Sequence, residues 1–205
     1  MAEPVWNLYS VLKNNFIDFN SNLQSLMKRF FLFSLLFMTT IITAQTNLIK
    51  NGGFEYDFVN WRGEENGALS TYDKKSGKNG ALINQYTGAE WRAFDQVVSI
   101  PRNTFAIECS AWMKTDGVEI QKEDYKAAAV IIEFTTDAEK KISSEVIGNA
   151  KGTTSWINYK KAIKVPSDAK KIRIMLALAQ TNGTVFFDDI KITTLSEEQF
   201  LKQNP

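Results

Sequence analysis

The chain has 205 residues, of which 44% are hydrophobic and 23% are charged. This length and apolar content suffice for one hydrophobic core and fall short of what two ordinary domains need. The 24 basic and 23 acidic residues nearly cancel, and Lys and Arg are not clustered, so the charge balance argues against a nucleic-acid partner. The absence of His excludes Ser-His and Cys-His nucleophilic arrangements.

An export signal is predicted near the start of the chain. Met27, Lys28 and Arg29 precede an apolar run, FFLFSLLFMTTIITA, that ends at Ala44. A basic start, an apolar centre and a small final residue predict that residues 27–44 are a secretory signal peptide, cleaved after Ala44. The run approaches the length of a membrane span, so an uncleaved anchor is the alternative. We expect a secreted or periplasmic protein without a permanent membrane anchor.

Residues 1–26 precede this signal and show no clear pattern. Met27 by itself begins a well-formed export signal. We therefore expect residues 1–26 to be a spurious or disordered extension, and translation to start at Met27.

From Thr46 onward the hydrophobic pattern has a period of two, interrupted by Gly, Asn, Asp and Pro turns. The predicted strands lie near 47–50, 53–56, 67–72, 80–86, 91–100, 104–115, 126–135, 142–147, 155–164, 170–180 and 184–194. Many short strands without a long helical pattern predict an all-β domain, a two-sheet antiparallel jelly-roll β-sandwich over residues 45–195. Residues 196–205 are predicted to be a C-terminal tail that begins with a short helix capped by Ser196.

The single cysteine, Cys109, has no partner for an internal disulfide. It shares its parity along an alternating segment with Phe105, Ile107, Ala111 and Met113. This pattern predicts a buried and unreactive thiol.

Several short motifs follow one another along the chain in a fixed order. They are NLIKNGGFE at 47–55, Trp61, Ser76-Gly77, Trp91 before QVV at 96–98, Trp156, Val165-Pro166 and VFFDDI at 185–190. In this order and spacing they resemble carbohydrate-binding modules of the family 4, 9 and 22 type, which have a galactose-binding-like fold. The resemblance covers roughly residues 46–194. It implies a jelly-roll sandwich with a structural calcium ion, and a sugar site on the concave face or in loops at one edge.

The resemblance also implies ligands for the calcium ion. In such domains the metal is bound by the acidic residue that ends the NGGFE-like stretch, by the first acidic residue of the DD-like pair, and by main-chain carbonyls. Here the two side chains are Glu55 and Asp188, and the carbonyl donors are expected between Lys75 and Lys78. Calcium prefers several hard oxygen ligands of this kind.

Strand parity gives a separate reason to single out Asp188. It is expected to share one row with Phe186, Ile190 and Ile192, and an acid in a core-facing row must be paired or coordinated. The alternative is that Asp188 caps turn amides while Glu55 lies in solvent.

Sugar recognition combines an aromatic platform with hydrogen-bonding groups. Trp91 and Trp112 each alternate with an apolar row, so both are expected on the outer side of a sheet, and the resemblance implies an aromatic contact at Trp91. Trp61 and Trp156 are expected to pack structurally. The other residues predicted to line the sugar site are Tyr86, Gln85, Arg92, Glu108 and Glu133, with Tyr125, Arg173 and Gln180 as weaker candidates.

These patterns predict a secreted, non-catalytic, calcium-stabilised module that binds a polysaccharide or glycan. The first alternative is a protein-interaction module of the same fold without sugar affinity, whose partner is an enzyme or an envelope protein. The second is a small glycan-cleaving enzyme, since two carboxylates suffice for that chemistry. Glu108 and Glu133 would then face each other from neighbouring strands, but nothing in the sequence marks either for a raised pKa, and we expect no enzymatic activity.

Overall fold

The computed structural model describes residues 23–24, 26–28 and 46–204, and the chain divides into two units, Met1–Ala44 and Gln45–Pro205. In the first unit, residues 23–24 and 26–28 are helical. The remainder of the expected extension 1–26 and signal peptide 27–44, including the cleavage position, lies outside the described residues. Within the described ranges no helix combines the length and the apolar content that crossing a bilayer requires.

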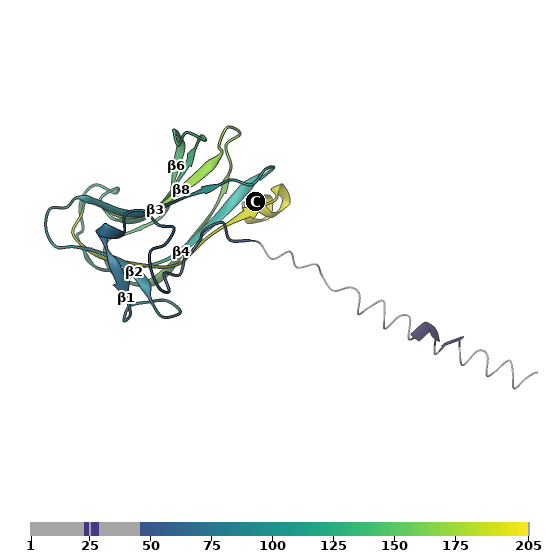
Figure 1. Ribbon diagram of the computed structural model, residues 1–205, viewed down its shortest axis with the longest axis horizontal. Helices are drawn as coiled ribbons and strands as arrows, with labels where there is room; N and C mark the ends of the chain where they lie inside the picture. Colours follow the sequence, from purple (N-terminus) through teal and green to yellow (C-terminus); the bar gives the residue numbers. More distant parts are fainter. Residues whose placement is uncertain (1–22, 25, 29–45, 205) are drawn as a thin grey trace, which may run out of the picture. The chain divides into compact units, whose positions relative to one another are not determined.

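The second unit is a sandwich of two antiparallel β-sheets (Figure 1). The five-stranded sheet has the order β1 (Ala68–Ser70), β2 (Gly80–Gln85), β9 (Gly183–Leu195), β4 (Ala106–Val118) and β7 (Gly152–Lys164). The four-stranded sheet has the order β3 (Trp91–Ser99), β8 (Lys171–Ala179), β5 (Ala128–Thr135) and β6 (Lys141–Ala150). A short 3-10 helix, η1 (Glu64–Asn66), and a terminal helix, α2 (Glu197–Gln203), complete the unit. The predicted two-sheet jelly-roll sandwich is confirmed.

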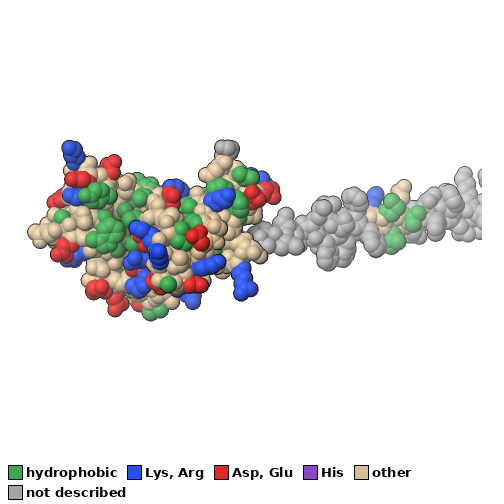
Figure 2. Space-filling model, turned by 90° about the horizontal axis from the view of Figure 1, so that it is seen from above, with side chains coloured by type: hydrophobic (Ala, Val, Ile, Leu, Met, Phe, Trp, Pro, Cys, Tyr) green, Lys and Arg blue, Asp and Glu red, His purple; other side chains and the backbone are tan. Residues whose placement is uncertain are grey.

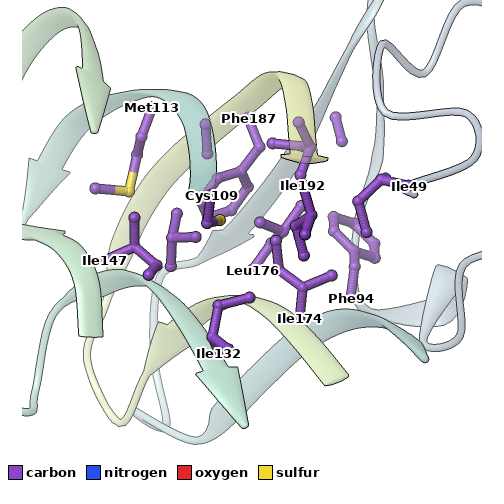
Figure 3. Close-up of a cluster of buried hydrophobic side chains, with 14 of the residues drawn as sticks. Ile49, Phe94, Cys109, Met113, Ile132, Ile147, Ile174, Leu176, Phe187 and Ile192 are labelled. Atoms are coloured by element: carbon purple, nitrogen blue, oxygen red, sulfur yellow. The ribbon is translucent and has the colours of Figure 1, made fainter. Parts of the chain in front are cut away.

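Alternation along β4 shows how the sequence forms the core. Ile107, Cys109, Ala111 and Met113 are fully buried between the sheets, while the residues between them face outward. Ile132, Ile174 and Leu176 face them from the four-stranded sheet (Figure 3). Each of the Ile, Leu and Met side chains gains about 1.5–3 kcal/mol on leaving water, which fixes the register of the strand.

Cys109 is buried in this core, as predicted. Burial, with a smaller contribution from the charge of Glu108, raises the pKa of Cys109 to about 12. The thiol therefore stays protonated at neutral pH and is not a nucleophile.

The predictions of strands at 47–50 and 53–56 are wrong. The first segment runs beside β9, and Leu48 N donates to Ile192 O (2.8 Å), but the side chain of Asn47 makes the neighbouring bond by accepting from Ile192 N (2.9 Å). Asn51 and Phe54 then adopt positive φ angles, which end any extended run. Ile49 and Phe54 are buried, so these hydrophobic side chains pack in the core although their backbone does not form a β-strand.

A bulge in β9 also changes the predicted rows. Ser110 pairs with Lys191 and Trp112 with Asp188, so β9 holds one extra residue between these pairs. Asp189, with φ 50°, absorbs it. The expectation that Asp188 shares a core-facing row with Ile190 and Ile192 is therefore wrong, because Val185 and Phe187 join that row instead.

The predicted C-terminal helix is confirmed as α2. Ser196 caps it, accepting from Gln199 N (3.2 Å), while the Gln199 side chain accepts from Ser196 N (2.9 Å). This reciprocal pair satisfies two amides at the helix start.

Candidate functional site

The outer surface of the four-stranded sheet changes in character from one end to the other. We call this surface the Trp91 face, after the residue at one end of β3. Antiparallel pairing places the outward side chains of β3, β8 and β5 in three successive cross-strand rows: Ala93, Ala177 and Ala129; then Asp95, Met175 and Ile131; then Val97, Arg173 and Glu133. A floor of alanines beside Trp91, in which Ala93 is partly exposed and Ala129 and Ala177 are buried, therefore leads to a band of charged groups. Figure 2 shows hydrophobic side chains on this side of the domain with charged ones around them.

Trp91 projects from one end of this face with 48% of its surface exposed. The loop before it, residues 86–90, is held in place by polar contacts. Gln85 Nε2 donates to Glu90 O (3.3 Å) and Thr181 O (3.0 Å), and Ala89 N donates to Asn182 Oδ1 (3.0 Å). These bonds fix the backbone of the loop that leads directly into Trp91.

Three residues expected in the sugar site lie around this loop, and only one is well exposed. Tyr86, at the start of the loop, is 78% exposed. Gln85 is 3% exposed, and its amide binds the loop backbone instead of facing solvent. Arg92 alternates with Trp91, pairs with Leu178 and belongs to the row of the buried Phe94.

A line of alternating charges crosses the far end of the Trp91 face. Asp95 Oδ1 accepts from Arg173 Nη2 (2.9 Å), and Asp95 Oδ2 accepts from Arg62 Nε (2.7 Å). Arg173 also lies 3.7 Å from Glu133, which lies 3.8 Å from Lys141. Arginine N–H groups and carboxylates in fixed positions are suited to binding the hydroxyl groups of a sugar.

The neighbouring carboxylates favour the protonated, cationic form of Arg173. The hydrogen bond that Arg173 donates to Asp95, followed by the charges of Asp95, Glu133 and Glu139, raises the pKa of Arg173 above its ordinary value despite partial burial. Arg173 therefore stays a cationic donor throughout the accessible pH range.

Arg62 and Asp95 were not among the residues predicted for the site. Asp95 shares its parity with Trp91 along β3, a signal that the sequence did contain. Arg62 follows the buried Trp61 and pairs with Asp95 through an isolated β-bridge. No local sequence pattern predicts this pairing.

Trp112 and Glu108 lie on the outer side of the five-stranded sheet and thus on the opposite face from Trp91. Glu108 forms an ion pair with Lys160 (2.9 Å), and Lys75 Nζ lies 4.0 Å from the Trp112 ring centroid. The expectation that Glu108 and Glu133 face each other from neighbouring strands is wrong, because β4 and β5 belong to different sheets.

The remaining aromatic residues are placed as follows. Trp61 is buried beside Phe54 and donates from Nε1 to Asn51 O (3.0 Å), so its predicted packing role is confirmed. Trp156 lies 6.5 Å from the Phe186 ring. Tyr125 is exposed in the loop between β4 and β5, and Gln180 is exposed after β8.

Glu55 and Asp188, the expected calcium ligands, do come together around one loop. A methyl group on Gly53 would lie 3.6 Å from Glu55 Oε1 and 3.9 Å from Asp188 Oδ1. Asp188 Oδ2 accepts from the amides of Lys75 (2.8 Å) and Ser76 (2.9 Å). The loop 71–79 thus covers Asp188, which is fully buried although it faces away from the sandwich core.

The same loop binds the other carboxylate. Glu55 Oε2 accepts from Lys78 N (2.7 Å), and Asn79 Nδ2 donates to Glu55 O (2.7 Å). Gly77 lies between them with φ +60°, a conformation that glycine adopts without strain. Lys75 and Lys78 therefore present amide N–H groups to the two acids, where carbonyl oxygens were expected, and the amides on Asp188 match the alternative that it caps the turn.

The donor set fits a calcium ion in its chemistry. Both side chains supply hard carboxylate oxygens, but they are only two, and the described residues contain no group of three or more His, Cys, Asp or Glu side chains placed to hold a metal. A calcium ion at this loop would take its other ligands from main-chain carbonyls and water. Burial raises the pKa of Asp188, opposed by its hydrogen bonds to Ser76, Lys75 and Asp189.

No family model matches the chain, and no curated protein sequence matches it. Among solved structures, it is similar to a family 16 carbohydrate-binding module, with a TM-score of 0.52 and 16% identity over 72% of this chain and 99% of that one. It is also similar to the CBM22-1 xylan-binding domain of Paenibacillus barcinonensis Xyn10C, with a TM-score of 0.52 and 12% identity over 75% and 97%. The domain therefore has the fold of carbohydrate-binding modules, as the motif order predicted.

A third similar structure belongs to a larger protein. It is the enzymatically active domain of tailspike protein 4 from bacteriophage CBA120, with a TM-score of 0.56 and 15% identity over 73% of this chain. The match spans 21% of the tailspike chain. At these identities the similarity concerns the fold alone.

Proposed function

We propose that this protein is an exported, non-catalytic carbohydrate-binding module that binds a polysaccharide chain along the Trp91 face. The observation that carries the proposal is the order of groups on that face: a half-exposed tryptophan, then a floor of alanines, then fixed arginine and carboxylate groups. The fold shared with known carbohydrate-binding modules supports it.

A sugar chain fits this order along the strand direction. From Trp91 to Val97, the residue beside Arg173, the face extends over seven residues of β3, or about 20 Å at the usual rise for six steps. This distance accommodates several sugar units. The first would stack its C–H face on Trp91, the next would lie over Ala93, and later hydroxyl groups would meet Asp95 and Arg173.

The state of the carboxylates supports a binding role over hydrolysis. Asp95 is held by two arginines, and Glu133 lies between Arg173 and Lys141. Hydrolysis of a glycosidic bond needs one carboxyl group that is protonated and directed at the leaving oxygen. Both carboxylates on this face are instead paired with cations.

We also propose a structural calcium ion at Glu55 and Asp188, with main-chain oxygens of the loop from Lys75 to Lys78. The ion would neutralise a buried carboxylate, whose ionisation burial disfavours. Its role would be to hold the loop 71–79 against β9.

Affinity electrophoresis of the full-length protein through gels containing neutral polysaccharides tests the sugar proposal. We expect the wild type to be retarded by at least one polysaccharide, and Trp91→Ala to lose about 30-fold or more in affinity, as expected for a central aromatic anchor. Tyr72→Ala is the matched control, because Tyr72 is a 96%-exposed aromatic residue in the loop 71–79.

Two outcomes would overturn the sugar proposal. One is that no polysaccharide retards the wild type, and the other is that Trp91→Ala behaves like Tyr72→Ala. Recovery of a single protein partner through the Trp91 face in the first case would favour the protein-interaction alternative.

A further inference from the structure

The outer side of the five-stranded sheet carries a second surface with a different chemistry. We call it the Trp112 face and define it by Lys75, Ser110, Trp112, Lys160 and Lys191. We propose that this face binds an anionic polysaccharide, one that bears carboxylate or sulfate groups. This proposal is independent of the neutral-sugar site on the opposite sheet.

Strand register brings two lysines to either side of a small residue. Ser110 of β4 pairs with Lys191 of β9 on one side and with Lys160 of β7 on the other. Neighbouring strands lie about 4.8 Å apart, so the backbones that carry the two lysines lie about 10 Å apart with Ser110 between them. Cys109 and Ile192 are fully buried, so their sequence neighbours Ser110 and Lys191 point away from the core.

An aromatic ring, Trp112, lies close to Ser110 and thus to Lys160 and Lys191, and a third lysine, Lys75, contacts it. Trp112 is two residues beyond Ser110 in β4 and is partly exposed. Lys75 Nζ lies 4.0 Å from its ring centroid, so an anion that contacts this ammonium is brought to the tryptophan ring. An acidic sugar offers an anionic group for Lys75, which itself lies over the Trp112 ring, and an apolar face for the part of that ring left exposed beside the ammonium.

The lysines of this face differ in whether a neighbouring acid pairs with them. The acids nearest to the lysines are already engaged, since Glu108 pairs with Lys160 (2.9 Å) and Asp73 pairs with Lys114. Among residues 46–204, neither Lys75 nor Lys191 has a carboxylate within 4.0 Å. Both lysines are exposed.

The two aspartates beside Lys191 are engaged as well. Asp188 is covered by the loop 71–79, and Asp189 Oδ2 accepts from the Ser76 hydroxyl (3.2 Å). These contacts direct both carboxylates to the loop 71–79, and not to the ammonium groups of Lys75 or Lys191.

The contrast with the other sheet favours an anionic ligand here. On the Trp91 face Arg62 and Arg173 share Asp95, and Lys141 lies beside Glu133, so its cations are compensated. On the Trp112 face two cations face solvent uncompensated. Charge complementarity therefore assigns an acidic chain to this side.

The test is affinity electrophoresis of the full-length protein in gels containing polygalacturonate, dextran sulfate or uncharged dextran. We expect retardation in one or both charged gels, which separates carboxylate from sulfate recognition, and none in dextran. The double variant Lys75→Gln/Lys191→Gln should bind about tenfold or more weakly, and added salt should weaken wild-type binding, since both lysines are exposed. Lys170→Gln is the control, because Lys170 is an exposed lysine in the loop between β7 and β8.

Trp91→Ala should leave this binding unchanged, so failure of the neutral-sugar site and failure of the Trp112 face are distinguishable. Absence of retardation by both charged polysaccharides would overturn the proposal. So would a double variant that binds as the Lys170→Gln control does, or equal retention of a double-stranded DNA fragment, which would show unspecific attraction to polyanions.

Discussion

Arg173 donates a hydrogen bond to Asp95 Oδ1 (2.9 Å) across the boundary between β8 and β3, while the other oxygen of Asp95 is bound by Arg62. Asp95 also pairs with Arg62 through its backbone, with Asp95 N donating to Arg62 O (3.0 Å) and Arg62 N to Asp95 O (2.8 Å). One aspartate thus fixes both the segment that leads into η1 and the arginine at the centre of the charged line. The stability of the edge of the sheet and the geometry of the proposed sugar site depend on the same side chain.

Replacement of Asp95 should therefore affect both properties. Asp95→Ala removes acceptors from two arginines and is expected to destabilise the fold by about 1–2 kcal/mol, since both arginines keep partial access to water. Polysaccharide affinity should fall as well, because Arg62 and Arg173 lose their fixed positions. Urea unfolding and affinity electrophoresis measure the two effects. Asp95→Asn, which keeps one acceptor oxygen, should lie between wild type and Asp95→Ala, and an Asp95→Ala protein with unchanged affinity would contradict the assignment.

Gln85 should influence sugar binding without touching the sugar. Gln85→Leu has a similar volume but no donor for the carbonyls of Glu90 and Thr181, so we expect a loss of about 1–3 kcal/mol in unfolding free energy. Because the loop 86–90 would loosen, Trp91 would be less well positioned and affinity would also fall. Tyr86→Ala is the informative comparison, since loss of this exposed ring should change stability by less than about 0.5 kcal/mol. Equal stability of the two variants would show that Gln85 does not brace the loop.

Strand parity in the sequence predicted much of this fold, because alternation reports directly which side chains leave water. It placed Cys109 in the core and Trp91 and Trp112 outside it. Parity does not report which sheet a strand joins, since that depends on long-range pairing. Trp91 and Trp112 were therefore both expected to line the sugar site, although they lie on opposite faces of the sandwich.

Two further errors have local physical causes. The bulge at Asp189 shifts the inward-facing row of β9 by one residue. An Asp in the sequence does not by itself predict a positive φ, so the bulge could not be foreseen. Gln85 was expected to be an exposed polar residue, but its amide donates to the carbonyls of Glu90 and Thr181. The bond to Thr181 joins segments 96 positions apart, and the period of the hydrophobic pattern carries no information about such a contact.

Substitution of Gly77 tests whether the loop 71–79 holds the Glu55 carboxylate. Its φ is +60°, and a Cβ there would overlap Glu55 Oε1 and displace the carboxylate from Lys78 N. Gly117 has almost the same φ, +59°, but a Cβ at that position would meet no atom within 4 Å, so Gly117→Ala carries the backbone cost alone, about 1 kcal/mol. We expect Gly77→Ala to cost about 1 kcal/mol more than Gly117→Ala in chemical unfolding. Equal costs would mean that Glu55 is not held against this loop.

Calcium should stabilise the protein in a pH-dependent way. Burial raises the pKa of Asp188 above its ordinary value of 3.8, so without metal its contribution to stability is fully present below that value and is lost as the pH rises through the raised pKa. A calcium ion binds the ionised carboxylate, so the gain in melting temperature on adding calcium should be small near about pH 4 and larger near about pH 7. Melting curves of the full-length protein with calcium and with a chelator measure the gain at each pH. Asp188→Asn should abolish it, and a wild-type midpoint that is the same with calcium and with chelator at neutral pH would exclude the ion from this loop.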